Sequence, residues 1–464
     1  MNTSKILPSS TQPSVQKAVG NDRNLGCLEQ VMEKLNSRAK TWNIVTISRI
    51  KGPLSAEILR QALDISQRHH PQLNSRIVRS RNKLCFQTEG TTKIPLRVVE
   101  KFVHEQWQEV VQEEMNQAID SSKCLMRVVL VHFQSNSHEN YLITTGHHAV
   151  GDGLSSIRLH SEILTYCQQI FSGQPINPVP SLIALPPIEE LLPTWTKSFK
   201  TKISNTLFLL QLGLQKIWHR PQNLGFEKYL PIAQRSSDIV HRQLEPELTQ
   251  QLIDCCRQAN TTVNSALCAA MMFIVASKIA KTKNKDQDIR VNCLSYLDLR
   301  RQLESHISDE QMTTLASSVM EFYTIRTNTS FWELAREVKQ NFEASKKDGG
   351  IYKMILVAKQ LIDFSLTYPK EVAATVSISN AGRVNIPKDY GEFELEEISF
   401  LASQALYAGM FITHVSTFQG KMLLNFAFSE PSISRNTMES IVNQFMSYIS
   451  HICNLKVQPS LTKI

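Results

Sequence analysis

Residues 147–153, His-His-Ala-Val-Gly-Asp-Gly, place two histidines, an aspartate and two glycines in one short segment. The preceding residues, 141–145, have the apolar and β-branched composition of a buried strand. Residues 155–164 have the apolar spacing of an amphipathic helix. A histidine at such a strand-to-helix junction reaches a cleft, and imidazole is the usual proton acceptor near neutral pH. The segment therefore predicts an acid/base site between a strand and a helix.

This segment resembles the H-H-x-x-x-D-G signature of the chloramphenicol-acetyltransferase-like superfamily. That superfamily includes condensation domains of peptide synthetases, polyketide-associated acyltransferases, alcohol acetyltransferases and the plant BAHD enzymes. Other stretches are similar to its opening strand, first helix, H-P-x-L turn, second-half helix start, D-L-R segment and S-N-x-G segment. They are residues 44–52, 55–68, 69–73, 261–267, 298–300 and 379–384. The D-F-G-W-G signature is absent, which argues against the BAHD branch.

The resemblance implies a mixed α/β fold with two chloramphenicol-acetyltransferase-like subdomains arranged as a V and a tunnel at their interface. The length of 464 residues also favours two domains over one core. Six of the 18 prolines fall between positions 175 and 193, where we expect an extended connector and no helix. We therefore predict a disordered tail at 1–22, an N-terminal subdomain at 23–174, a connector at 175–194 and a C-terminal subdomain at 195–464.

Composition limits the classes of partner. A net charge of +8 suits an acidic carrier protein or the phosphates of coenzyme A, and it suits equally a charge that only maintains solubility. Aromatic residues make up 7% of the chain and no long run of like charge occurs, so we expect no nucleic-acid partner. Nine cysteines without a C-x-x-C pair indicate a reducing, cytoplasmic location without disulfides or a metal site.

Residues 195–218 form a predicted leucine-rich helix that also carries several lysines. Such a helix packs against the protein with one solvated face, or it rests on a membrane surface or faces a lipid substrate. Its apolar run at 207–210 ends at Gln211, well short of the ~20 apolar residues that cross a bilayer. We expect no transmembrane span.

The resemblance also implies roles for the two histidines of the motif. His148 becomes the general base, which takes a proton from the acceptor and returns it to the leaving thiol. His147 becomes a structural residue whose ring is held by neighbouring backbone. A second pair, at 69–70, precedes Pro71 at a helix end and lacks the Asp-Gly that follows the motif histidines, so we interpret that pair as structural.

Four further positions belong to the predicted site. Asp152 could be a triad carboxylate, but the resemblance implies that it points away from the base and pairs with Arg300 of the other half. Gly153 keeps a side chain out of the channel beside the base and tolerates backbone angles that other residues resist. Ser379 and Asn380 border the tunnel by resemblance and could stabilise an oxyanion, although a simple Asn-Gly turn explains them nearly as well.

The activity implied is transfer of an acyl group from acyl-CoA or an acyl carrier protein to a hydroxyl of a lipid, polyketide or other small molecule. The thioester is a co-substrate, and no permanently bound cofactor is expected. Two alternatives remain open: a free-standing condensation domain that forms an amide between carrier-bound substrates, and a non-catalytic carrier-docking module. Motifs of serine hydrolases, P-loop proteins, dinucleotide enzymes and zinc proteases are absent from the sequence.

Overall fold

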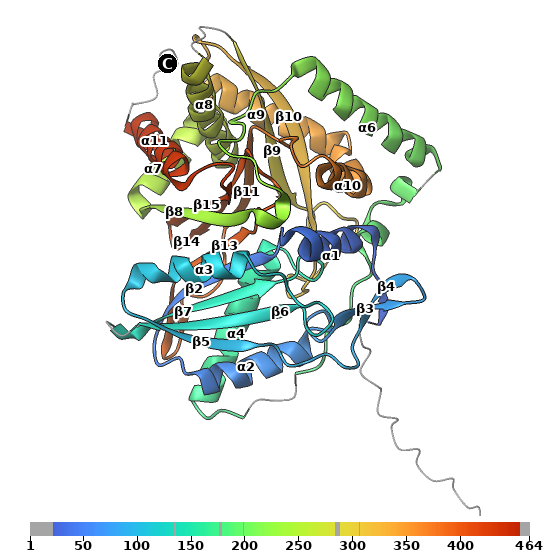
Figure 1. The fold of residues 1–464 in the computed structure, drawn as a ribbon. Helices are drawn as coiled ribbons and strands as arrows, with labels where there is room; N and C mark the ends of the chain where they lie inside the picture. Colours follow the sequence, from blue (N-terminus) through green and yellow to red (C-terminus); the bar gives the residue numbers. More distant parts are fainter. Residues whose placement is uncertain are drawn as a thin grey trace, which may run out of the picture.

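The computed structural model describes residues 22–133, 136–175, 179–197, 199–283, 288–305 and 307–454. The tail predicted at 1–22 lies outside them, except for its last residue. The described residues form two six-stranded mixed sheets and one three-stranded sheet, with helices packed around them (Figure 1). This arrangement confirms the mixed α/β class. The small sheet contains β1 (Arg23–Asn24), β3 (Arg76–Ser80) and β4 (Lys83–Gln87).

The first large sheet carries the histidine motif at the end of its strand β7. Alternate residues of its strands point to opposite faces, so Leu142 packs beneath the sheet while Ile143 packs above it. Helices α2 and α4 cover the lower face and α3 lies on the upper face, against the second sheet (Figure 1). The strand order is β12 (Asp389–Tyr390), β13 (Phe393–Ala402), β2 (Ile44–Lys51), β7 (Asn136–Gly146), β6 (Met126–Phe133) and β5 (Leu96–Lys101). The helices of this half are α1 (Cys27–Ala39), α2 (Ala56–His69), α3 (Trp107–Met115) and α4 (Gly153–Phe171).

Strands β12 and β13 depart from the predicted division of the chain. They lie within 195–464, which the sequence assigned to the C-terminal subdomain, yet they extend the N-terminal sheet. β13 pairs antiparallel with β2, with Glu394 opposite Lys51 and Ala402 opposite Ile44. The apolar side chains of β13 are buried in the core of that sheet, so the strand is stable only where that core covers it. The two halves therefore share a sheet and are not separate units.

The connector also differs from its prediction, because it contains the one-turn helix α5 (Ile188–Leu191). Pro187 stands at the N-cap of this helix, where its fixed φ is compatible with a helix start and its missing N–H is not needed. The carboxylate of Glu189 accepts a hydrogen bond of 2.6 Å from the backbone N–H of Leu28, which ties α5 to α1. A proline in front of the first turn thus begins a helix here.

The second large sheet forms the C-terminal half. Its strand β11 runs parallel to both neighbours, and the other pairs are antiparallel. One helix, α8, is long and apolar enough to cross a bilayer, but 72% of the apolar stretch at 263–282 is buried in the core of this half. The strand order is β10 (Ala316–Ile325), β9 (Ile289–Asp298), β11 (Val376–Arg383), β14 (Phe411–Phe418), β15 (Lys421–Glu430) and β8 (Ser236–Leu244). The helices are α7 (Pro246–Gln258), α8 (Val263–Lys283), α9 (Phe331–Lys347), α10 (Gly350–Thr367) and α11 (Arg435–Asn454).

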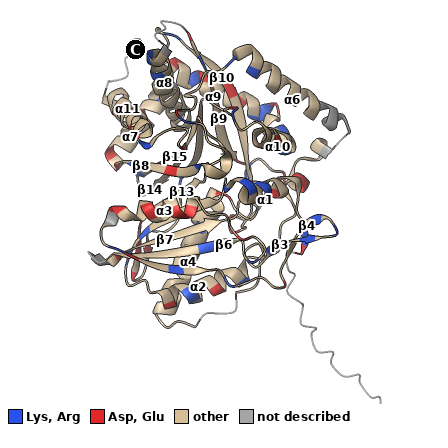
Figure 2. Cartoon of the chain, viewed as in Figure 1, with Lys and Arg blue, Asp and Glu red and all other residues tan. Residues whose placement is uncertain are grey.

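The leucine-rich helix predicted at 195–218 is present as α6 (Phe199–His219), after a short 3-10 turn at Thr194–Lys197. It lies along the edge of the C-terminal half, next to α10 and outside the strands β9 and β10 (Figure 1). Large apolar side chains remain exposed along its outer face: Leu207, Leu210, Leu214, Ile217 and Trp218. Figure 2 shows that α6 carries basic residues and no acidic ones.

Candidate active site

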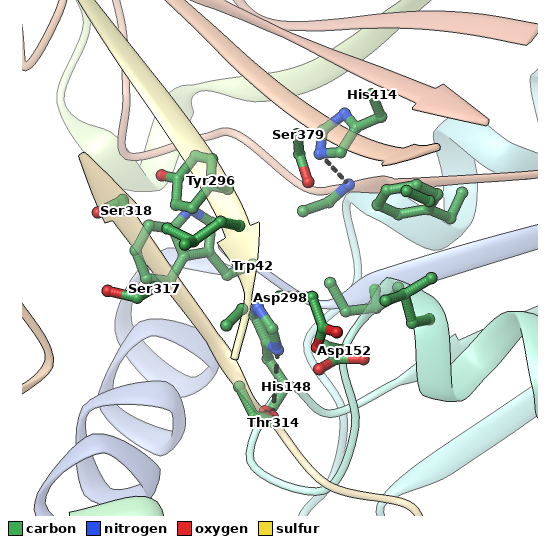
Figure 3. Close-up of a pocket in the computed structure, with 18 of the residues that line it drawn as sticks. Trp42, His148, Asp152, Tyr296, Asp298, Thr314, Ser317, Ser318, Ser379 and His414 are labelled. Carbon is green, nitrogen blue, oxygen red and sulfur yellow. Dashed lines mark hydrogen bonds between the residues drawn. The ribbon is translucent and has the colours of Figure 1, made fainter. Parts of the chain in front are cut away.

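A cavity of about 140 Å³ lies where the two halves meet, and His148 is part of its wall (Figure 3). The N-terminal half contributes residues from α1, the start of β2 and the histidine motif. The C-terminal half contributes residues from β9, β10, α10, β11 and β14. Strand β13, which pairs with the N-terminal sheet, completes the wall. The sequence-predicted residues among the lining are His148, Asp152, Gly153, Ser379 and Asn380.

The imidazole of His148 has one nitrogen engaged by the backbone. Its Nδ1 lies 2.9 Å from the carbonyl oxygen of Gly151, so Nδ1–H donates there and the lone pair remains on Nε2. Burial lowers the pKa of His148, which keeps the ring neutral at neutral pH. The hydroxyl of Thr314 donates to the carbonyl of His148 and braces the turn from the other half. Such a ring can accept a proton at Nε2.

The neighbouring His147 is held at both nitrogens. Its Nδ1 accepts a 3.1 Å hydrogen bond from the N–H of Ala149, so Nε2 carries the proton. Nε2 lies 3.0 Å from a carboxylate oxygen of Glu33 on α1. Since the His147 ring is buried and both its nitrogens have partners, it fixes the turn against α1 and has no free lone pair for a substrate.

Asp152 is the N-cap of α4 and the partner of Arg300. One carboxylate oxygen accepts from the N–H of Ser155 at 2.9 Å, which satisfies a free donor of the first helical turn. The other oxygen accepts from the Nη1 of Arg300 at 2.9 Å and from the N–H of Leu315 at 3.0 Å. Burial alone would raise the pKa of Asp152, but the charge and hydrogen bonds of Arg300 and the backbone N–H groups hold that pKa below its ordinary value.

The sequence left a triad role open for Asp152, and the hydrogen bonds favour the ion pair. The partner of the His148 Nδ1–H is the Gly151 carbonyl, whereas the Asp152 carboxylate is bonded to Arg300 and to backbone N–H groups. Arg300 also donates to Asp298 at 2.8 Å. The aspartate of the motif thus joins the two halves and begins α4.

Gly153 is required for a different reason than the sequence suggested. A Cβ atom at this position would lie 2.5 Å from ring atoms of Phe400 on β13, a distance that no real contact shows. Its φ is not positive, so unusual backbone angles are not the reason. The first residue of α4 must be small because strand β13 passes directly against it, and the same residue lines the cavity of His148.

Ser379 and Asn380 lie on β11, in the wall contributed by the C-terminal half. Figure 3 shows Ser379 facing the cavity across from His148. The side-chain oxygen of Asn380 accepts a 2.8 Å hydrogen bond from the N–H of Gly382, whose φ is +68°. The Asn380 side-chain oxygen therefore stabilises the turn after the strand, and this bond does not involve the Nδ2 donor of the same amide. Both residues are partly buried.

The sequence analysis missed the aromatic side of the cavity. The ring of Trp42 meets that of His148 edge-on at 6.2 Å and stacks on Tyr407 at 5.4 Å. Trp42 has a φ of +64°, a strained value for a bulky residue, and its N–H donates to the Ser403 carbonyl at 2.9 Å. No local sequence pattern signals a tryptophan held in this way.

His414 was also missed. Its Nε2 accepts a 3.1 Å hydrogen bond from the N–H of Ala402, which ties β14 of the second sheet to the end of β13 (Figure 3). Burial lowers the pKa of His414 to about 3, so the ring stays neutral. The neutral ring supports the floor of the cavity as a hydrogen-bond acceptor.

Among the described residues, one group of side chains has metal-ligating atoms close together: His69, His70 and Glu162, within 4.8 Å of one another. Nε2 of His70 is already bonded to Glu162 at 2.8 Å, and His69 Nδ1 lies 2.7 Å from the Pro180 carbonyl. None of the three lines the cavity of His148. The pair at 69–70 therefore acts as a structural link between α2, α4 and the connector.

Comparison with known proteins gives two family matches. Residues 30–181 match the Condensation domain family, and residues 233–427 match the family described as phthiocerol/phthiodiolone dimycocerosyl transferase C-terminus. No curated protein sequence matches the chain significantly.

Similar solved structures cover nearly the whole chain at low identity. Polyketide synthase associated protein 5 from Mycobacterium tuberculosis is 15% identical with a TM-score of 0.65, covering 93% of this chain and 98% of its own. Trichothecene 15-O-acetyltransferase from Fusarium sporotrichioides is 12% identical with a TM-score of 0.71, covering 93% and 95%. The first condensation domain of the calcium-dependent antibiotic synthetase is 12% identical with a TM-score of 0.66, covering 96% and 99%.

Two sheet-based halves with an H-H-x-x-x-D-G turn at their interface define a protein of the chloramphenicol-acetyltransferase-like class. Within that class the chain belongs to the superfamily of condensation domains and CoA-dependent acyltransferases, as its sequence predicted. The families matched indicate acyl transfer in secondary metabolism.

Proposed function

We propose that the protein transfers an acyl group from a thioester, acyl-CoA or acyl carrier protein, to a hydroxyl group of a small-molecule or lipid acceptor. The observation that carries this proposal is the state of His148: a neutral ring whose Nδ1–H is held by Gly151 and whose Nε2 remains available in the interface cavity. A neutral imidazole with one free lone pair is the group that an attacking hydroxyl requires.

The proposed reaction needs one base and two aligned substrates. As the acceptor oxygen attacks the thioester carbon, its proton passes to Nε2 of His148, and the carbonyl oxygen takes up negative charge. Ser379 is the proposed donor to that oxyanion, with Asn380 in support. The C–S bond then breaks, and the imidazolium returns the proton to the thiolate, which gives ester, free thiol and neutral His148. Direct transfer in a ternary complex gains its rate from alignment of the two substrates.

An amine acceptor would use the same base, so condensation to an amide is the second candidate. The match of residues 30–181 to the Condensation domain family favours it. The match of residues 233–427 to an acyltransferase C-terminus, and the TM-score of 0.71 with an O-acetyltransferase, favour ester formation. A non-catalytic docking module is the third reading, and the intact motif argues against it.

The proposed setting is a reducing, cytoplasmic compartment. All nine cysteines are free thiols, and most are buried in the apolar cores. Figure 2 shows both signs of charge spread over the helices and strand edges, so the net charge of +8 is not gathered into one basic face in this view.

The test is a panel of acyl-CoA, acyl-carrier and acyl-N-acetylcysteamine donors offered with alcohol and amine acceptors, with thiol release and product mass measured. We expect ester formation by the wild type and a loss of about 10²–10⁴-fold for His148→Ala. His69→Ala, a histidine outside the cavity, is the matched control and keeps full turnover. Exclusive amide formation would favour condensation. Equal turnover of His148→Ala and wild type, or a larger loss for His147→Ala, would overturn the assignment of the base.

A further inference from the structure

A second and larger cavity, of about 410 Å³, lies beneath α6. Its walls come from the inner face of α6, from α10, and from the faces of β9 and β10 that point away from the main core. The lining is largely apolar and includes Leu209, Leu212, Leu294, Met320, Phe322 and Leu361. A cavity of this size and composition accepts a substantial apolar ligand.

The second cavity adjoins the cavity of His148. Trp42, Tyr296 and Met354 line both cavities. The ring of Trp42 lies 6.3 Å from that of Tyr296 and 6.2 Å from that of His148, centroid to centroid. The two cavities are therefore neighbours separated by the aromatic rings of Trp42 and Tyr296, and an acyl chain that starts beside His148 has to pass Trp42 to reach the space beneath α6.

Several polar side chains of this lining already have partners within the protein. Lys216 donates to the Val372 carbonyl at 3.3 Å and pairs with Glu371 at 3.4 Å. The amide of Asn292 is bonded to the backbone and side chain of Thr375, and the Ser365 hydroxyl donates to the Leu361 carbonyl. A ligand with charges or many hydrogen-bonding groups would find these groups engaged, whereas a hydrocarbon chain needs none of them.

A glycine in the middle of α6 keeps part of this space open. Gly213 lines the cavity between Leu212 and Lys216, and a Cβ placed there would meet nothing within 4 Å. Glycine is among the least favourable residues inside a helix, so helix stability does not explain it. A larger side chain at this position would project from the face of α6 that lines the cavity with Leu209, Leu212 and Lys216.

We propose that the cavity beneath α6 binds the alkyl chain of the acyl group that is transferred; this rests on the acyltransferase function proposed above. The thioester arm of the donor leads back to coenzyme A or a carrier protein, which is too large to enter the cavity. The acceptor has to enter the active site from solvent, and the product has to leave it. The tail of the acyl group is the part of the donor with no need to reach solvent. A side space with apolar walls, next to the reacting carbonyl, suits that tail.

The experiment measures binding of acetyl-, octanoyl- and dodecanoyl-N-acetylcysteamine thioesters by calorimetry, together with their turnover. Gly213→Leu and Gly213→Trp fill the cavity by different amounts. Gln211→Trp places the same indole on an exposed position of α6 outside the cavity and is the matched control. Thermal unfolding of each variant verifies that it is folded.

We expect Gly213→Trp to raise the Kd of the dodecanoyl thioester by about tenfold or more while that of the acetyl thioester stays unchanged. Gly213→Leu raises the Kd of the dodecanoyl thioester by a smaller factor, and Gln211→Trp leaves the Kd of all three thioesters unchanged. An equal loss of affinity for all three donors would mean that the cavity binds the thioester arm. No loss of affinity for any donor would mean that the cavity binds neither the arm nor the alkyl chain. Either result would overturn the inference. Because binding is read without turnover, absence of thiol release in the wild type would count against the proposed function alone.

Discussion

Arg300 and Asp152 form an ion pair with two hydrogen bonds across the junction of the two halves. Nη1 of Arg300 lies 2.9 Å from Oδ2 of Asp152, and Nη2 lies 3.2 Å from Oδ1. The side chains belong to residues that are 7% and 5% exposed, so the pair is almost fully removed from water. The same carboxylate caps α4 and accepts from the N–H of Leu315. The motif aspartate therefore holds the turn that carries His148 against the C-terminal half.

Removal of either partner of this pair should lower stability. Asp152→Ala leaves Arg300 with Asp298 as its remaining carboxylate. Arg300→Ala leaves the buried Asp152 charge with two backbone N–H groups and the Ser155 hydroxyl but no cation. Breaking a buried pair costs ~3–5 kcal/mol. We expect the loss for Asp152→Ala to fall at the lower end of that range, because Asp298 persists. Thermal and denaturant unfolding of the two variants measure these losses.

The double variant distinguishes a true pair from two independent losses. If the residues are partners, Asp152→Ala with Arg300→Ala is less damaged than the sum of the single changes. Strict additivity would show that they do not interact. An Asp152→Asn variant that melts normally but has lost turnover would instead support a triad-like role for the carboxylate.

The pH dependence of turnover should report the buried state of His148. Burial lowers its pKa from the ordinary 6.5, and the neutral ring is the active form. Activity is therefore complete above that pKa and falls only as the pH drops through it, so the acid limb of kcat/KM lies below pH 6.5. The profile is recorded with an N-acetylcysteamine donor, which carries no titrating phosphate. An acid limb above pH 6.5 would contradict a buried, neutral base.

Gly153→Ala should damage the protein through Phe400. The added methyl would lie 2.5 Å from the ring, and overpacking of this kind costs typically ~1–3 kcal/mol. The start of α4, and with it the turn of His148, must then shift, so we expect lower stability and lower kcat. Phe400→Leu in the same chain should restore part of both, since it removes the ring edge.

Gly146→Ala is the matched control for that experiment. Gly146 lies at the end of β7, just before the motif, and a Cβ there would meet nothing within 4 Å. We expect it to melt and turn over as the wild type does. Equal damage from both changes would indicate that the whole segment rejects side chains, and failure of Phe400→Leu to rescue would show that Phe400 is not the cause.

The resemblance of a few short motifs was enough to predict the fold class, the superfamily and some of the residues that line the junction. His148, Asp152 and Arg300 could be named because their types and spacing are local to two short segments. Ser379 and Asn380 could be named from a third. Each of these segments starts or ends a regular element, so its position in the fold followed from the order of strands and helices.

What the sequence did not reveal depends on contacts between distant segments. No strand was predicted at residues 393–402, and these residues form β13, which joins the N-terminal sheet. The requirement for Gly153 depends on Phe400 of that strand, so it was assigned to an open channel. Trp42 lies in a short link between α1 and β2 with a positive φ that tertiary contacts impose.

The last prediction concerns recognition of the donor. If the basic surplus of +8 attracts an acidic carrier protein or coenzyme A phosphates, kcat/KM for those donors falls steeply as salt rises and screens the surface charges. An acyl-N-acetylcysteamine thioester has neither group, so its kcat/KM should be lower at low salt and nearly independent of salt. Stopped assays compare the donors from about 20 to 500 mM salt. This range includes the concentration of about 0.1 M at which the Debye length falls to ~10 Å. If the truncated donor matches the full thioester at every salt concentration, neither carrier nor coenzyme is recognised by charge, and the surplus serves solubility alone.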